Sequence, residues 1–393
     1  MARTPRYQAE SGVSPLWASE PFRVFFPLGI AAGIFGLILW PLHYLGWWPT
    51  YPAIQHPRIL ILGFGAAFLF GFLGTAWPRF LEAKVLSAYE VAVLLFTWCV
   101  SQLYYVKGDI PHGDLASAIA CLWLLIILGV RMIRRERELP PPGFALAFSS
   151  VALTTVTLFC WVAGWDKHSP EWYHVFRLIA YQGFLLLPLM GVGSYLFARF
   201  FQIPGRKPTM APAKYRGPAV WGSAVIVLVS FAVEAFLSAR YGNLLRLAGL
   251  AVWAAGAVPG IWMVRAPGTR PWALRLGLIL IAVGFLCRTI WPLQLFAFEH
   301  LLFLCGFGLV IMLTADRVIM GHCASPAEVE LKSKTWRWIA WLTFIAAATR
   351  ATADLVPSTR VSHHIYAAIM VSIVLLIWFV MHVKRFSREA PSE

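Results

Sequence analysis

Charged residues are scarce in this chain of 393 residues: Asp, Glu, Lys and Arg together make up 13% of it, about half the usual share of a soluble domain. Hydrophobic residues make up 59%. A soluble fold of this length cannot hide so many apolar side chains, and a disordered chain does not contain them. The composition therefore excludes both classes and indicates a protein that uses the lipid bilayer as a second solvent.

Several sequence motifs that carry chemistry are also missing. The chain has no P-loop, no G-x-S-x-G and no H-E-x-x-H motif, which removes the commonest signatures of nucleotide hydrolysis, serine hydrolysis and zinc proteolysis. Its six cysteines are scattered and include no C-x-x-C-H haem-attachment motif, so any haem bound here would be non-covalent. No close cysteine pair suggests a disulfide or a zinc site.

Long apolar runs account for most of the sequence. A run of roughly 20 apolar residues is long enough to cross a bilayer as a helix. The sequence predicts an all-α, polytopic membrane helix bundle with about twelve transmembrane helices, placed at Val24–Gly46, Gln55–Trp77, Leu86–Val106, Asp114–Ile133, Phe144–Trp165, Tyr173–Phe201, Pro218–Ala239, Leu244–Val264, Trp272–Thr289, Leu295–Met320, Trp336–Ala353 and Val361–Val383. The ninth and eleventh runs are the weakest, because each ends in an arginine, Arg288 and Arg350.

The basic residues predict the orientation of these helices. The net charge is +15, and 24 of the 33 Lys and Arg residues fall at the N-terminus, in the even-numbered loops or in the C-terminal tail. Because basic residues collect on the cytoplasmic side, residues 1–23 and 384–393 are expected to be cytoplasmic. The charge is thus mainly an orientation signal, with some attraction to anionic headgroups of the lipid bilayer, and no nucleic-acid binding is needed to explain it.

The chain is expected to form one integral membrane domain over residues 1–393. The first apolar run is too long for a cleavable signal peptide, so it is expected to be a retained span. The longest connections, at 199–217 and 322–334, are short and basic and leave no room for a soluble domain. Any activity must then lie between helices or at a membrane face.

The ten histidines are distributed unevenly, and eight of them belong to the predicted outer side or outer half of the membrane. Neutral imidazole is a common protein ligand of haem iron and copper, and histidines from several helices can form such a site in a bundle. His300 lies about five residues inside an apolar span, where an ionisable group is costly and indicates function. The loop histidines are more simply explained as solvated side chains. The eight are His43, His56, His112, His168, His174, His300, His363 and His364.

A few charged residues also fall in the outer halves of the predicted spans. Arg288 and Arg350 would hold the propionates of a haem through bidentate hydrogen bonds. The alternative is that each arginine pairs with an acidic residue, and the candidates are Glu234, Glu299 and Asp354.

One internal echo links two of the histidines. The segment Trp40-Pro41-Leu42 precedes His56, which is followed by Gly63-Phe64-Gly65; Trp291-Pro292-Leu293 precedes His300, which is followed by Gly306-Phe307-Gly308. The glycines would allow close approach of a neighbouring helix or a flat ligand. The echo favours His56 and His300 as equivalent partners.

Two segments of the chain resemble the NnrS family. The first is Leu16-Trp17-Ala18-Ser19-Glu20-Pro21-Phe22-Arg23-Val24-Phe25-Phe26. The second starts at His56-Pro57-Arg58 and runs through Gly63-Phe64 to Gly71-Phe72-Leu73-Gly74-Thr75-Ala76-Trp77-Pro78-Arg79. His300, the Gly306 region, Arg317 and Gly321-His322 look like a later motif of that family.

The resemblance implies a bacterial inner-membrane protein that binds haem, and also copper, and takes part in the response to nitric oxide or in defence against nitrosative stress. It makes His56 and His300 the leading ligands for haem and metal, and places His322 at a cytoplasmic motif position. Family members often have a second histidine and a glutamate where this chain has Arg58 and Ile59. A compensating metal ligand would then be His43, His363 or His364.

Two other classes of function remain open at this level. Twelve spans with both ends inside are typical of a transporter of a small metabolite or metal complex. A non-catalytic assembly factor for respiratory enzymes is the other. Whether the protein turns over a substrate is not encoded in any motif, and no electron donor or protein partner is apparent. The concentration of histidines on one side favours the haem hypothesis, because carriers seldom need so many.

Overall fold

A computed structural model describes residues 14–135, 143–200, 213–263, 268–323 and 333–388. Within these ranges the chain forms helices and no strand, which confirms the all-α prediction. Nine long helices are continuous: α2 (Phe22–Tyr44), α5 (Ala88–Lys107), α6 (Ile110–Ile133), α7 (Phe144–Val162), α10 (Ala213–Phe236), α11 (Ala239–Gly256), α13 (Thr269–Ile290), α16 (Lys334–Leu355) and α17 (Arg360–Phe386).

Three further rods are composite, because each has a π-helical segment between two α-helices. They are α3–η2–α4 (Gln55–Arg58, Ile59–Gly65, Ala66–Phe80), α8–η4–α9 (Pro170–Arg177, Leu178–Gly183, Phe184–Phe200) and α14–η5–α15 (Leu295–His300, Leu301–Gly308, Leu309–Cys323). The remaining described elements are single turns: α1 (Leu16–Ser19), η3 (Trp165–Lys167), α12 (Gly260–Met263) and η7 (Pro357–Thr359).

Ten of the long helices in the described ranges are apolar enough, and long enough, to cross a membrane. The ninth predicted span, α13, is among them despite Arg288, whereas α11 and α16 are not. The multi-pass architecture is therefore established, and the total of twelve crossings remains a prediction for those two helices. The eighth span also ends earlier than expected: α11 stops at Gly256 and a separate turn, α12, follows Pro259, because proline cannot donate the backbone hydrogen bond that a helix needs.

Polar side chains fix the starts of several helices. Ser87 and Glu90 form a reciprocal capping box at the start of α5, with the Ser87 N–H donating to the Glu90 carboxylate over 2.8 Å. Asp109 accepts from the His112 N–H at the start of α6, and Ser169 accepts from the Trp172 N–H at the start of α8. These caps satisfy amide groups that lack partners in the first helical turn, so the chain reverses direction within a few residues.

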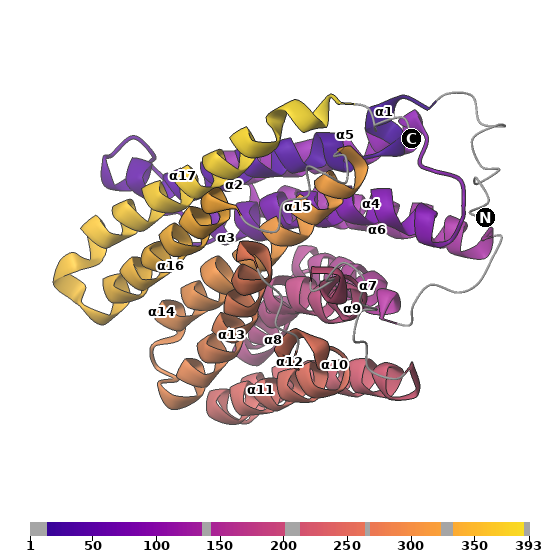
Figure 1. Cartoon of the computed structure of the whole chain (residues 1–393). Helices are drawn as coiled ribbons and strands as arrows, with labels where there is room; N and C mark the ends of the chain where they lie inside the picture. The colour runs from indigo at the N-terminus through magenta and orange to yellow at the C-terminus, as the bar shows by residue number, and fades with distance from the viewer. Residues whose placement is uncertain (1–13, 136–142, 201–212, 264–267, 324–332, 389–393) are drawn as a thin grey trace.

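The rods lie roughly parallel, and both described chain ends lie at the same end of the bundle (Figure 1). Arg23 at the start of α2 ties them together, because its Nη1 donates to the carbonyl oxygens of Arg385, Phe386 and Arg388 over 2.8–3.0 Å. Glu20 pairs with Arg23 at the same place. We call this the inner end, following the predicted orientation, and the opposite end, where α2 leads into α3, the outer end.

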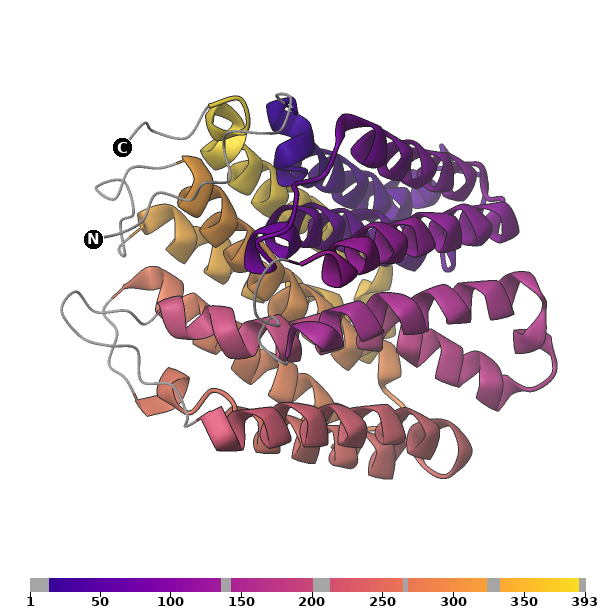
Figure 2. The same cartoon turned by 90° about the vertical axis from the view of Figure 1, so that its right-hand side faces the viewer.

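The three composite rods hold the centre of the bundle. The rods α3–η2–α4 and α8–η4–α9 are the most deeply buried of the candidate spans. The hairpins α5–α6, α10–α11 and α16–α17 pack on the outside, and α17 closes against α2 (Figure 2). Exposed Trp47, Tyr51 and Trp165 lie at outer helix ends, the position of an interfacial aromatic belt.

The π-helical segments follow directly on ionisable residues of the centre. Arg58 precedes η2, Arg177 precedes η4 and His300 precedes η5. The two similar sequence segments also share a backbone conformation. Each contains a π-helical segment that ends at a glycine, Gly65 in η2 and Gly308 in η5. π-Helical turns are rare and are frequently found at functional sites, so the outer ends of these three rods are the region in which to look for a site.

Candidate functional site

His56 and His300 lie side by side at the outer end of the central rods. Their ring centres are 6.4 Å apart and their ring planes differ by 29°. His56 belongs to α3, and His300 is the last residue of α14. The structure thus brings together the two histidines that the internal echo pairs.

Both imidazoles use the same ring nitrogen for a backbone hydrogen bond. His56 Nδ1 lies 2.9 Å from the Gly36 carbonyl oxygen, and His300 Nδ1 lies 2.7 Å from that of Phe296. A carbonyl oxygen only accepts, so Nδ1 must carry the proton in each ring. The neutral tautomer that results leaves the Nε2 lone pair free in both rings, which is the arrangement that metal-binding histidines commonly show.

A second group of side chains adjoins this pair. The Tyr44 hydroxyl lies 2.7 Å from His364 Nδ1, and His364 Nε2 faces Asp354 at 3.9 Å. His364 is 7% exposed, and its Nε2 has no hydrogen-bond partner within the described residues. The Trp40 ring links the two groups, at 6.1 Å from His56 and 5.2 Å from His364.

Arg350, on α16, lies beside these two groups of side chains. Its Nη1 donates to Asp354 Oδ2 over 2.7 Å, which confirms the predicted charge-pairing alternative for this arginine. It also lies close enough to act electrostatically on His56 and His300. His56, His300, His364 and Arg350 therefore share one region.

The other two candidate histidines point to separate partners. His363 Nδ1 contacts the Thr352 hydroxyl at 2.6 Å, and His43 Nδ1 contacts the Trp48 carbonyl oxygen at 3.1 Å. The adjacent His363 and His364 thus form different contacts. Across the described ranges, no three His, Cys, Asp or Glu side chains are grouped closely enough to hold a metal ion by themselves.

Arg288 belongs to a buried charge network next to the histidine pair. Its Nη2 donates to Glu234 over 2.7 Å, its Nη1 to Glu299 over 3.1 Å and its Nε to Asn243 over 3.0 Å. The predicted pairing of Arg288 with acidic residues is therefore confirmed. Glu299 is a member of this network and directly precedes His300 in α14, so the network and the histidine pair are covalent neighbours.

Three guanidinium groups face two carboxylates in this network. Arg246 and Arg288 both pair with Glu234, while Arg177 and Arg288 both pair with Glu299. Arg246 is 0% exposed, and its Nη2 has no hydrogen-bond partner in the described part of the chain. The rings of two phenylalanines, 4.6 and 5.1 Å from its guanidinium carbon, offset part of this cost through cation–π attraction.

A separate buried ion pair lies beside His56 in sequence. Arg58 and Asp114 form a two-pronged contact of 2.7 and 3.0 Å, and both are at most 5% exposed. The Tyr105 hydroxyl donates to Asp114 over 2.8 Å, and the Arg58 guanidinium stacks 3.7 Å from the Trp161 ring centre. Arg58 also donates to the Tyr181 hydroxyl. Arg58 departs from the family pattern, and each of its three guanidinium nitrogens has a hydrogen-bond partner.

The sequence interpretation missed several of these participants. The sequence patterns do not single out Arg177 or Arg246, and they mark Asp114 only as the start of a predicted span. The sequence does contain a signal for these three residues, because burying an ionisable side chain in an apolar run costs free energy unless the side chain is paired. Trp40 has a signal only as the first residue of the internal echo, and Tyr44 has none, since aromatic residues at helix ends are ordinary in membrane proteins.

Comparison with known families agrees with this architecture. The family model described as NnrS protein matches residues 15–389 of the chain, which includes every side chain of the site. No curated protein matches the chain.

Proposed function

The chain belongs to the NnrS family, and on this premise we propose that it binds haem non-covalently through His56 and His300 and acts in the response to nitric oxide. Its membrane would be the bacterial inner membrane, with nitric oxide or a related small molecule as the ligand. The proposal assigns no catalytic turnover, because no side chain of the site supplies electrons.

The observation that carries this proposal is the shared tautomer of the facing histidine pair. Both Nδ1 atoms bond to backbone carbonyl oxygens, so both Nε2 atoms are free acceptors. With their ring centres 6.4 Å apart, the two imidazoles are near enough to act together on one bound group.

The number of protein donors favours haem over a bare metal ion at this pair. A porphyrin itself supplies most ligands of its iron, so one or two histidines are enough to hold haem, whereas a copper site needs several protein donors. A copper ion in addition would take His364, whose Nε2 is buried and faces this region, with His43 or His363 as further candidates.

The arginines of the site would act in different ways. Arg350 uses Nη1 for Asp354, and its other nitrogens would hold a propionate. Arg288 donates from all three nitrogens to protein acceptors. It would support the site by fixing Glu299, and with it the neighbouring His300, and would bind a propionate only by exchanging one of these partners. A bound haem would supply an iron that can bind nitric oxide.

Purified protein tests this proposal directly through its optical spectrum and metal content. We expect a haem band in the wild type and its loss in His56→Ala and in His300→Ala, with membrane insertion unchanged. His168→Ala is the matched control, because His168 is exposed in an outer turn. A wild-type protein without haem or metal would refute the proposal. Uptake of a substrate into vesicles by such a protein would favour the transporter, and copurification with a respiratory enzyme would favour the assembly factor.

A further inference from the structure

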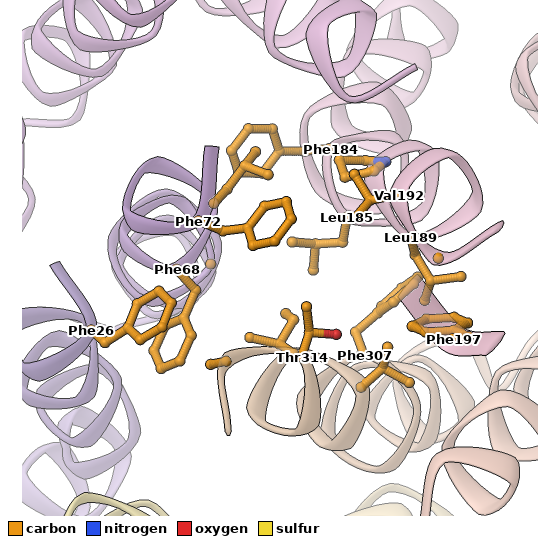
Figure 3. Close-up of a pocket in the computed structure, with 17 residues that line it drawn as sticks. Phe26, Phe68, Phe72, Phe184, Leu185, Leu189, Val192, Phe197, Phe307 and Thr314 are labelled. Carbon is orange, nitrogen blue, oxygen red and sulfur yellow. The ribbon is translucent and has the colours of Figure 1, made fainter. Parts of the chain in front are cut away.

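A half-open cavity of about 90 Å³ lies between the central rods, on the inner side of the histidine site. Residues from α2, η2, α4, α9, η5 and α15 line it, and Figure 3 shows their side chains arranged around an open centre. Phe26, Phe72 and Phe184 are among the lining residues and are at most 7% exposed. Most of its wall thus belongs to the protein interior rather than to the lipid surface.

The chemistry of this wall is almost entirely apolar. Phenylalanine, leucine, valine and isoleucine form most of it, and Thr314 supplies the one side-chain hydroxyl among the lining residues (Figure 3). A buried water needs two to four polar partners, and an apolar cavity without them stays dry. We call this cavity, lined by the residues of Figure 3, the apolar chamber.

The chamber begins where the three π-helical segments end. Gly65 is the last residue of η2, Phe184 follows η4, and Phe307 lies near the end of η5; all three line the wall. Phe307 is seven positions after His300, so it lies further along the same rod toward the inner end. The same three rods therefore carry the polar site at one level and the apolar chamber at the next.

We propose that the apolar chamber binds a small, neutral, apolar molecule of the size of a diatomic gas, taken up from the bilayer. This inference rests on the proposed function and extends it, because it provides a place where such a ligand collects beside the histidine site. An apolar cavity of roughly 150 Å³ takes up benzene or xenon. The smaller chamber is suited to smaller ligands, and its lining offers no partner to an ion or to a polar solute.

Filling the chamber should abolish this binding. Ala315 and Val192 line it from α15 and α9 and are 2% and 5% exposed. Ala315→Leu adds bulk from one side and Val192→Phe from the other, so one variant remains informative if the other fails to fold. Ala232→Leu is the matched control, since Ala232 is exposed on α10.

Xenon-129 NMR of the purified full-length protein provides the measurement. We expect a saturable xenon shift in the wild type and in Ala232→Leu, reduced at least several-fold in each filling variant. The same shift should persist in His56→Ala, which separates the chamber from the haem proposal. Equal shifts in filled and unfilled proteins would overturn the inference. Xenon binding that appears only after lipid is stripped away would assign the chamber to an acyl chain and would also overturn it.

Discussion

The imidazole of His56 lies 6.4 Å from that of His300, centre to centre, and each ring donates Nδ1–H to a backbone carbonyl oxygen of a helix. The backbone thus decides which nitrogen of each ring remains free. A pair fixed in this way needs little reorganisation to accept a ligand between its rings, which is the advantage that a preorganised site has over a flexible one.

The contact between Tyr44 and His364 provides a prediction about copper. Tyr44→Phe removes the 2.7 Å hydrogen bond to His364 Nδ1, so the ring loses its orientation. If His364 is a copper ligand, affinity should fall about 10- to 100-fold, as for other outer partners of metal-binding histidines. Copper titration of the purified protein measures this. Tyr366→Phe, exposed on the same helix, should change nothing, and equal affinity in both variants would remove His364 from the site.

The buried pair of Arg58 and Asp114 predicts strongly non-additive effects on stability. Arg58→Met or Asp114→Leu alone leaves an uncompensated charge and should lower the free energy of unfolding by about 3–5 kcal/mol. The double variant restores neutrality and should lose much less. Unfolding of the three proteins in detergent tests the idea, which fails if the two single effects simply add.

Glu234 is predicted to be the most sensitive acid of the charge network. It accepts from Arg246, Arg288 and His174 over 2.7–3.1 Å. Glu234→Gln therefore removes the carboxylate that pairs with buried Arg246 and one of the two carboxylates that pair with Arg288. We expect a loss of about 3–5 kcal/mol in stability. Glu171→Gln, at the partly exposed start of α8, is the matched control. Equal unfolding temperatures for the two variants would contradict this role.

The orientation of the bundle is testable with reporter fusions. The positive-inside pattern predicts that a fluorescent protein fused after the C-terminal tail folds in the cytoplasm and that alkaline phosphatase there is inactive. A fusion placed at the outer turn near His168 should give the opposite pair of results. Phosphatase activity at the tail would reverse the orientation and would place the histidine site on the cytoplasmic side.

Part of this structure was predictable because the signals are local. Apolar runs indicate every long helix, and the internal echo predicts that His56 and His300 are partners, whose rings the structure brings close together. The end of α11 was less accurate, because its apolar run continues past Pro259 although the helix does not. The π-helical segments were not predicted, since the pattern of apolar residues does not distinguish a wider helix from an ordinary one.

The residues read in order are enough to indicate a multi-pass helical membrane protein and its family, because hydrophobicity and short motifs are properties of neighbouring residues. Only the packing of the helices shows that Arg58 pairs with Asp114 and that Arg288 joins Glu234 to Glu299. It also shows that Tyr44 contacts His364. A charge buried in a low-dielectric interior must find its partner on another helix, and that partner depends on how the helices pack.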